Sequence, residues 1–210
     1  MADRDSATGR PVPIRLLLAS SNPGKLREYR ELAKNSVLAL ALLPNFREVV
    51  EFEETAPTFA ENAAAKALYY GRFTDELLLA DDSGLVVPAL GGAPGVYSAR
   101  YAGPKATDRD CVRKLLCAMD GKTGTERRAR FVCVIALAHR GRALAVVSDF
   151  VEGTIVVEPR GAHGFGYDPI FLIRGVSLTS AEISQDEKNR LSHRGKAFRK
   201  LRDLLANPSF

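Results

Sequence analysis

Apolar residues fall into short runs along the first part of this chain, and polar turns that contain glycine separate the runs. The run at 15–19 suits a short buried strand, and residues 25–34 follow it with helical spacing. Thr58-x-x-Glu61 then opens an alanine-rich helix as a capping box, and 77–80 reads as the next buried strand. Strand, turn and helix in this order predict α/β units.

The middle of the chain combines one helix with two long strands. Thr107-x-x-Asp110 caps a helix that we expect to end near Met119. Two longer runs, 129–139 and 143–153, flank Gly141-Arg142 and predict an antiparallel hairpin.

The last part of the chain predicts a loop, a short strand and a helix. A glycine-rich loop at 161–168 precedes a strand at 169–173, and Ser192 caps the final helix. α/β units with a central hairpin predict a mixed β-sheet with helices on its faces. We expect residues 1–13 to be a flexible leader and residues 14–210 to form a single domain.

The composition excludes several classes of protein. With 46% hydrophobic and 26% charged residues, the 210-residue chain has the profile of a globular protein. No apolar run approaches the roughly 20 residues of a membrane span, and the polar N-terminus lacks the apolar stretch of a secretory signal. Three cysteines without a CxxC motif favour a reducing compartment. These features predict a soluble cytoplasmic protein.

The net charge of +5 is compatible with a nucleic acid partner and equally with a small phosphorylated substrate. A solvated helix face would also explain the strongest basic cluster. No motif for reading DNA or RNA is present, so a nucleic-acid-binding module ranks below an enzyme. The cluster consists of Arg194, Lys196, Arg199, Lys200 and Arg202.

The turn after the first strand is a candidate anion site. Backbone N–H groups and a helix N-terminus favour an anion, and Lys25 adds a positive charge. The turn is not a Walker A loop, because Leu26 follows the lysine. An ordinary loop in which Asn22 supplies a local turn is the alternative. The segment comprises Ser20, Ser21, Asn22, Pro23, Gly24 and Lys25.

Carboxylates offer a second candidate site. Asp81 and Asp82 directly follow the strand at 77–80, and carboxylate oxygens are ligands that Mg²⁺ prefers. Successive strand residues point to opposite faces, so at most one of the two faces a given pocket. A carboxylate can also act as a general base toward water. An Asx-type turn or helix cap is the alternative for this pair, and a solvated acidic stretch is the alternative for Glu53 as a second metal ligand.

Two further segments offer groups for binding a base. Phe165 stands between two glycines, so its ring can be exposed and stack on a base, although a turn with two buried aromatics is equally compatible. His193 and Arg194 begin the final helix, and arginine suits carbonyl or phosphate oxygens. Lys188 lies shortly upstream.

Taken together, six segments resemble the non-canonical purine nucleoside triphosphate pyrophosphatases, which are also called the inosine triphosphatase or dITP/XTP diphosphatase family. The resemblance covers about 15–206, with the segments in order. They are Ser-Asn-x-Gly-Lys at 21–25, Phe-x-Glu-Asn-Ala at 59–63, Ala-Asp-Asp-Ser-Gly at 80–84, Gly-Gly-x-Pro-Gly-x-Tyr-Ser-Ala-Arg-Tyr at 91–101, Gly-Phe-Gly-Tyr-Asp-Pro-Ile-Phe at 164–171 and Ser-His-Arg-Gly-Lys-Ala at 192–197.

The resemblance implies an activity and a fold. It implies hydrolysis of ITP, dITP and XTP at the α–β phosphoanhydride, which removes deaminated purines from the nucleotide pool. It implies a need for Mg²⁺, a homodimer, and no membrane or stable nucleic acid partner. The fold it implies is an elongated, two-lobed α/β fold around a long mixed β-sheet flanked by helices.

It also implies roles for single residues. Asp82 takes the position of the catalytic base and, with Glu53, of a metal ligand. The turn at 20–25 takes the phosphate-binding position, and Ser83 that of a substrate contact. The remaining positions belong to the base-recognition and substrate pocket, namely Phe165, Gly166, Tyr167, Asp168, Lys188, His193 and Arg194.

Two details qualify this picture. Many members have Thr-Gly-Asn where this chain has Ser20-Ser21-Asn22, and Ser21 adopts a positive φ less readily than glycine does. Donors from His193 and Arg194 would meet the C6 carbonyl of hypoxanthine or xanthine. The amino group of adenine would face those donors unpaired, at a cost of about 1–3 kcal/mol.

Overall fold

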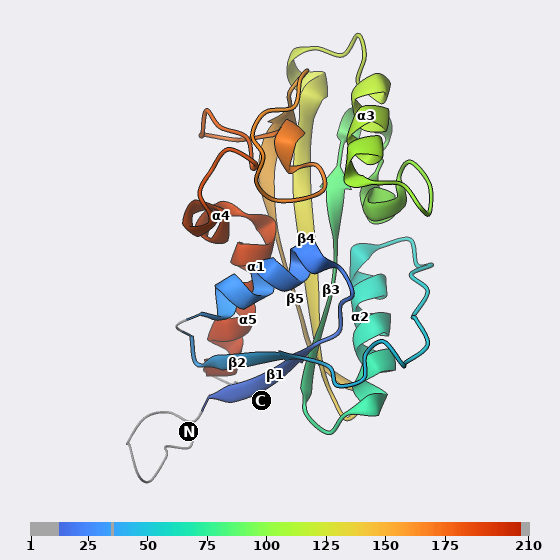
Figure 1. Cartoon of the computed structure of the whole chain (residues 1–210), viewed down its shortest axis with the longest axis vertical. Coiled ribbons are helices and arrows are strands. Elements are labelled where there is room, and N and C mark those ends of the chain that lie inside the picture. Colours follow the sequence, from blue (N-terminus) through green and yellow to red (C-terminus); the bar gives the residue numbers. More distant parts are fainter. Residues whose placement is uncertain (1–12, 35, 207–210) are drawn as a thin grey trace. The chain divides into compact units, whose positions relative to one another are not determined.

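The computed structural model describes residues 13–34 and 36–206, and Figure 1 traces the path of the chain. The expected leader at 1–13 lies outside the described residues, except for Pro13. The chain divides into two compact units. Unit 1 comprises the residues up to 82, 134–148 and those from 197 onward, and unit 2 comprises 83–133 and 149–196.

The strands form a six-stranded sheet in the order β2-β1-β3-β4-β5-β6. β1 pairs in parallel with β2 and β3, whereas β6 is antiparallel to β5, so the sheet is mixed. This arrangement confirms the α/β class and the mixed sheet. The strands are β1 (Ile14–Leu18), β2 (Leu38–Leu42), β3 (Leu77–Val86), β4 (Arg128–His139), β5 (Arg142–Ile155) and β6 (Phe171–Ile173).

The helices of unit 1 are amphipathic elements with side-chain caps. Asn22 caps α1 (Pro23–Ala33), and Thr58 caps α2 (Phe59–Tyr70) by accepting from the Glu61 N–H. The predicted capping box at Thr58 is only half formed, because the Glu61 carboxylate accepts from the Thr58 hydroxyl and not from its N–H. α5 (His193–Ala206) starts in unit 2 and continues in unit 1. Within unit 1, the rings of Tyr29 and Phe198 meet edge to face at 5.7 Å and join α1 to α5.

The helices of unit 2 begin with full capping boxes. Thr107 caps α3 (Asp108–Ala118) and Ser184 caps α4 (Gln185–Leu191). Leu85, Leu115 and Phe171 are fully buried in its core. The short 3-10 helices of the chain are η1 (Gly71–Phe73), η2 (Pro88–Leu90), η3 (Gly95–Arg100), η4 (Gly124–Arg127) and η5 (Asp168–Ile170).

Several predictions about these elements were wrong or incomplete. β3 does not end at residue 80, because it continues through Asp81 and Asp82 to Val86. The hairpin turn is Arg140-Gly141, whose φ angles of 50° and 69° suit a two-residue turn with positive φ at both positions. β2 and α4 were not predicted. Among the described residues, no helix is long and apolar enough to span a membrane.

Candidate functional site

In unit 1, strand register brings the turn after β1 next to the middle of β3. Leu18 pairs with Leu79, and the Ala19 N–H donates to the Leu79 carbonyl at 2.9 Å. The Asn22 side chain caps α1 by accepting from the Lys25 N–H at 3.0 Å. The ammonium of Lys25 then reaches the Asp81 carboxylate at 3.1 Å. The turn is therefore both a local cap and a neighbour of the aspartate pair.

Asp82 is held by a side chain that is itself fixed. Asn62 Nδ2 donates to Asp82 Oδ2 at 3.0 Å, inside the protein. The same amide donates to the Ala56 carbonyl and accepts from the Ala56 N–H. Burial raises the pKa of Asp82, and the positive charges of Lys25 and Lys66 act in the opposite direction.

A second lysine completes the group. Lys66 donates to the Asp81 carbonyl at 3.1 Å and forms an ion pair with Glu54. Burial, assisted by the positive charge of Lys25, lowers the pKa of Lys66 to about 8. We call the set of Lys25, Glu54, Asn62, Lys66, Asp81 and Asp82 the unit 1 cluster.

Three members of this cluster were missed by the sequence reasoning: Glu54, Asn62 and Lys66. A signal for two of them was present. Asn62 belongs to the Phe-x-Glu-Asn-Ala segment, and Lys66 follows it by four residues, which puts both side chains on one side of α2. The polar pair on an otherwise alanine-rich helix indicates a common partner.

The structure does not bring Glu53 to this cluster through any described contact. Glu53 is exposed, and the neighbouring Glu54 is the acid that reaches Lys66. Within the described residues, no three acidic, histidine or cysteine side chains are grouped closely enough to hold a metal. The donor chemistry nevertheless fits Mg²⁺, because Asp81 and Asp82 offer carboxylate oxygens and a cation would favour the ionised form of the buried Asp82.

In unit 2, a buried ion pair shapes the glycine-rich loop. Lys188 and Asp168 pair with side chains that are only 6% and 5% exposed. Asp168 Oδ2 also accepts from the Phe165 N–H at 2.8 Å. Gly164 has a φ of +81°, and a Cβ there would collide with the Asp168 carboxylate, so only glycine fits. The pair thus fixes the backbone on which Phe165 stands.

Arg194 joins this loop to the second half of β3. Its Nη2 donates to Ser83 Oγ at 2.6 Å, and its guanidinium carbon lies 5.7 Å from the centre of the Phe165 ring. Lys188 Nζ lies 5.4 Å from the same ring. We call Ser83, Phe165, Asp168, Lys188 and Arg194 the unit 2 cluster. Five of the predicted substrate residues are therefore together.

The other predicted residues of this region have different surroundings. The imidazole of His193 stacks on Phe131 at 4.9 Å. Tyr167 is buried, and its hydroxyl donates to the Ser98 carbonyl at 2.9 Å, while burial raises its pKa. The Gly166 N–H donates to Asp108. Phe165 is half-buried, whereas Tyr167 is in the core. The loop therefore matches neither a fully exposed Phe165 ring nor a turn with two buried aromatics.

Ser21 is not among the described residues with a positive φ, so the loss of the family glycine causes no strain there. The basic cluster of the last helix is partly engaged, because Lys196 donates to the Phe150 carbonyl and Lys200 to the Ser148 carbonyl. It is therefore not a uniformly solvated basic face.

The fold and the two clusters define an α/β protein in which the buried carboxylates of β3 face lysines from α1 and α2. Comparison with known proteins identifies the family. The Ham1 family pattern matches residues 16–204, and the chain belongs to this family. The dITP/XTP pyrophosphatase of Bacillus subtilis (strain 168) is 43% identical over 189 residues, which cover 90% of this chain and 96% of that protein.

Solved structures agree with this assignment. The HAM1 protein from Coxiella burnetii superimposes with a TM-score of 0.81 at 42% identity, covering 92% of this chain and 98% of that one. The Staphylococcus aureus Ham1 protein has a TM-score of 0.80 at 36% identity, covering 91% and 98%.

Proposed function

We propose that the protein hydrolyses non-canonical purine nucleoside triphosphates, namely ITP, dITP and XTP, at the α–β phosphoanhydride. The products are the nucleoside monophosphate and pyrophosphate. The observation that carries the proposal is the buried Asp82, which Asn62 holds while Lys25 and Lys66 surround the neighbouring Asp81. Relatives named dITP/XTP pyrophosphatase over 90% of the chain support the substrate class.

We assign the unit 1 cluster to binding the phosphates and activating the attacking water. Asp82 accepts a proton from the attacking water, and its burial, which raises the pKa, makes it a stronger base than an exposed aspartate. The oxygen of this water bonds to the α-phosphorus while the anhydride bond between the α- and β-phosphates breaks, so the monophosphate forms and pyrophosphate leaves. Lys25 at the start of α1 and the turn at 20–25 bind phosphate oxygens.

The proposed cofactor of the hydrolysis is Mg²⁺. Asp82 and Glu53 are its proposed ligands, and the oxygens of Asp81 and Glu54 lie in the same cluster. When bound, the ion neutralises negative charge on the phosphates. Glu53 is exposed, whereas the neighbouring Glu54 points to Lys66.

The unit 2 cluster is assigned to the base. The half-buried ring of Phe165 offers a surface for stacking, and Arg194 and Lys188 are donors that suit the C6 carbonyl of hypoxanthine and xanthine. Ser83 is a substrate contact oriented by Arg194. His193, Gly166, Tyr167 and Asp168 shape this region, with Asp168 fixing the backbone of the loop.

A substrate panel tests the proposal. ITP, dITP, XTP, GTP and ATP are incubated with the protein in MgCl₂, and pyrophosphate and orthophosphate are measured separately over the first minutes. We expect pyrophosphate to appear first and the three deaminated purines to be preferred. Reactions with EDTA are the control for the metal. Orthophosphate as the first product, or ATP as the best substrate, would refute the assignment.

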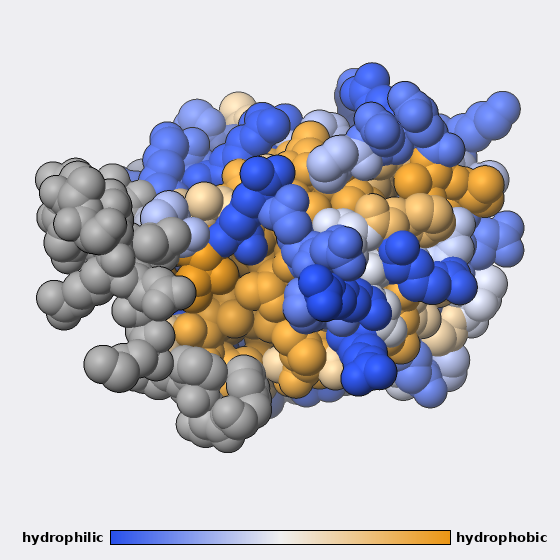
Figure 2. Space-filling model, turned by 90° about the horizontal axis from the view of Figure 1, so that it is seen from below, coloured by the Kyte–Doolittle hydropathy of each residue, from blue (hydrophilic) through white to orange (hydrophobic). Residues whose placement is uncertain are grey.

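The proposal extends to the oligomeric state, the compartment and the partners of the protein. We propose a homodimer in the cytoplasm without a stable nucleic acid or membrane partner, in which residues 14–210 work as one domain behind a leader. Figure 2 shows apolar side chains gathered on one face of the surface, and such surfaces often belong to interfaces. Sedimentation velocity at several concentrations tests the dimer, and a monomer at all of them contradicts it.

A further inference from the structure

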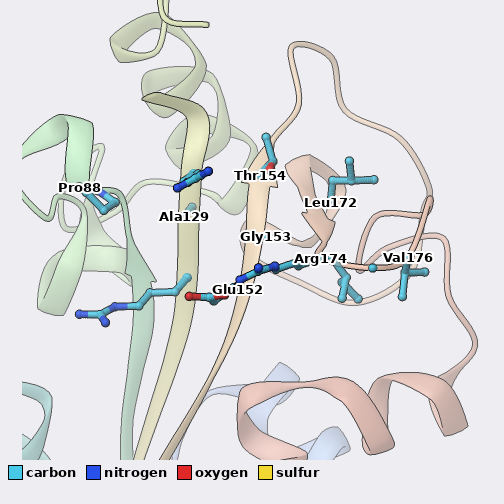
Figure 3. A pocket seen from close by; sticks show the side chains of 12 residues that line it. Pro88, Ala129, Glu152, Gly153, Thr154, Leu172, Arg174 and Val176 are labelled. Carbon is cyan, nitrogen blue, oxygen red and sulfur yellow. Dashed lines mark hydrogen bonds and ion pairs between the residues drawn. The ribbon is translucent and has the colours of Figure 1, made fainter. Parts of the chain in front are cut away.

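A pocket of about 620 Å³ opens on the outer face of the sheet in unit 2 (Figure 3). Residues of η2, β4, β5, β6 and the turn after β6 line it. None of these described lining residues belongs to the unit 2 cluster. The pocket is therefore separate from the groups assigned to the base.

Strand alternation explains why the pocket is charged. On β4, Ala129 is buried while Arg128 and Arg130 on either side of it are exposed. On β5, Gly153 is buried while Glu152 is exposed. The Arg130 guanidinium lies 5.9 Å from the Phe150 ring, so the outward side chains of both strands share one face.

The charges on this face are not balanced. Arg174, after β6, forms an ion pair with Glu152, and its N–H donates to the Glu152 carbonyl at 3.0 Å. Figure 3 shows the two side chains next to each other. Within the described part of the chain, Arg128 and Arg130 have no carboxylate partner. Two guanidinium groups thus face the pocket without a counter-charge.

Two residues on one strand face lie about 7 Å apart at their Cα atoms, a spacing at which two guanidinium groups can hold one phosphate between them. Thr154 adds a hydroxyl. Pro88, Leu172 and Val176 supply apolar walls that an inorganic ion would not use. The volume also lies in the range of small-molecule sites, roughly 300–1,000 Å³.

We propose that this pocket binds a small organic phosphate. Its phosphate group lies on Arg128 and Arg130, and its apolar part lies against Pro88 and Leu172. The proposal does not depend on the nucleotide hydrolysis proposed above, because it uses none of the residues assigned to that reaction.

An amide-resolved NMR titration of the full chain tests the location. Phenyl phosphate is the probe, because it carries a phosphate and an apolar ring without a purine, and phenol and inorganic phosphate are the comparison ligands. We expect saturable shifts at the amides of Arg128, Arg130, Thr154 and Arg174, weaker binding of inorganic phosphate, and none of phenol. Shifts confined to the unit 1 or unit 2 clusters, or no saturation at all, would overturn the proposal.

Three variants test the chemistry. Arg130→Ala should weaken binding about tenfold or more, as expected for the loss of a contact to a charged group. Glu152→Gln should strengthen it several-fold, because Arg174 is then free to bind the phosphate. Arg109→Ala, at an exposed position on α3, is the matched control and should change nothing. Equal weakening by Arg130→Ala and Arg109→Ala would mean unspecific attraction and would overturn the site.

Discussion

Each unit of the protein contains a buried lysine–aspartate pair, and the two pairs differ in what surrounds them. In unit 1, the side chains of Lys25 and Asp81 are 13% and 1% exposed. In unit 2, those of Lys188 and Asp168 are 6% and 5% exposed. The exposed fractions of the side chains alone therefore do not distinguish the two pairs.

Their surroundings carry opposite charge. The unit 1 cluster sets two lysines against three carboxylates, so it is net negative. The unit 2 cluster sets a lysine and an arginine against one carboxylate, so it is net positive. An excess of carboxylate suits a cation, whereas an excess of donors suits carbonyl oxygens. The charges around an ion pair, and not its burial, therefore distinguish a cluster that suits a cation from one that suits carbonyl oxygens.

The largest expected effect separates chemistry from stability in unit 1. Asp82→Asn should lower turnover of ITP by roughly 10²- to 10⁴-fold, because the amide cannot accept the proton of water. The melting temperature should stay the same or rise, since a buried charge is removed. Initial rates and thermal unfolding measure the two effects. Asp120→Asn, at an exposed position, is the control, and near-normal turnover of Asp82→Asn would remove Asp82 from the mechanism.

The next effect concerns the pair in unit 2. Lys188→Met should lower the free energy of unfolding by about 3–5 kcal/mol, because Asp168 then remains buried without its lysine. Denaturant unfolding measures the change. Lys105→Met, at an exposed position in the same unit, should change it by less than about 0.5 kcal/mol. If the two variants are equally stable, the pair does not hold the loop.

The smallest effect distinguishes the two lysines. Lys25→Met should raise the KM for ITP by about 10- to 150-fold, as expected for a lost contact to a charged group. Its free energy of unfolding should fall less than in Lys188→Met, because Lys66 remains beside Asp81. Lys34→Met, just beyond the end of α1, is the control. A stability loss as large as that of Lys188→Met would make the two pairs equivalent.

Local signals made several elements predictable. Thr58 and Thr107 each bind an N–H three residues ahead, so their helices begin where the sequence says. The end of β3 was not predictable in this way. Two consecutive aspartates look like a turn, but Lys25 and Asn62, which lie far away in the sequence, supply their partners and allow the strand to continue. Partners at such separations leave no local pattern.

Within the site, the sequence did not predict which of two neighbouring glutamates joins the unit 1 cluster. Along an extended segment, consecutive side chains point to opposite sides, so the choice between Glu53 and Glu54 depends on a register of one residue. Composition marks that stretch as acidic without selecting the side chain. Lys66 and Asn62 were detectable in principle, because helical spacing fixes which positions share a side.

The hydrogen bonds of the Asn62 amide make the site sensitive to deamidation of this side chain. Its two ends are not interchangeable, because the nitrogen faces Asp82 and the Ala56 carbonyl while the oxygen faces the Ala56 N–H. Conversion of this one side chain to aspartate by hydrolysis of its amide would leave its size nearly unchanged. It would nevertheless replace a donor by a negative charge against Asp82, so a lesion of a few atoms would repel the carboxylate it normally holds.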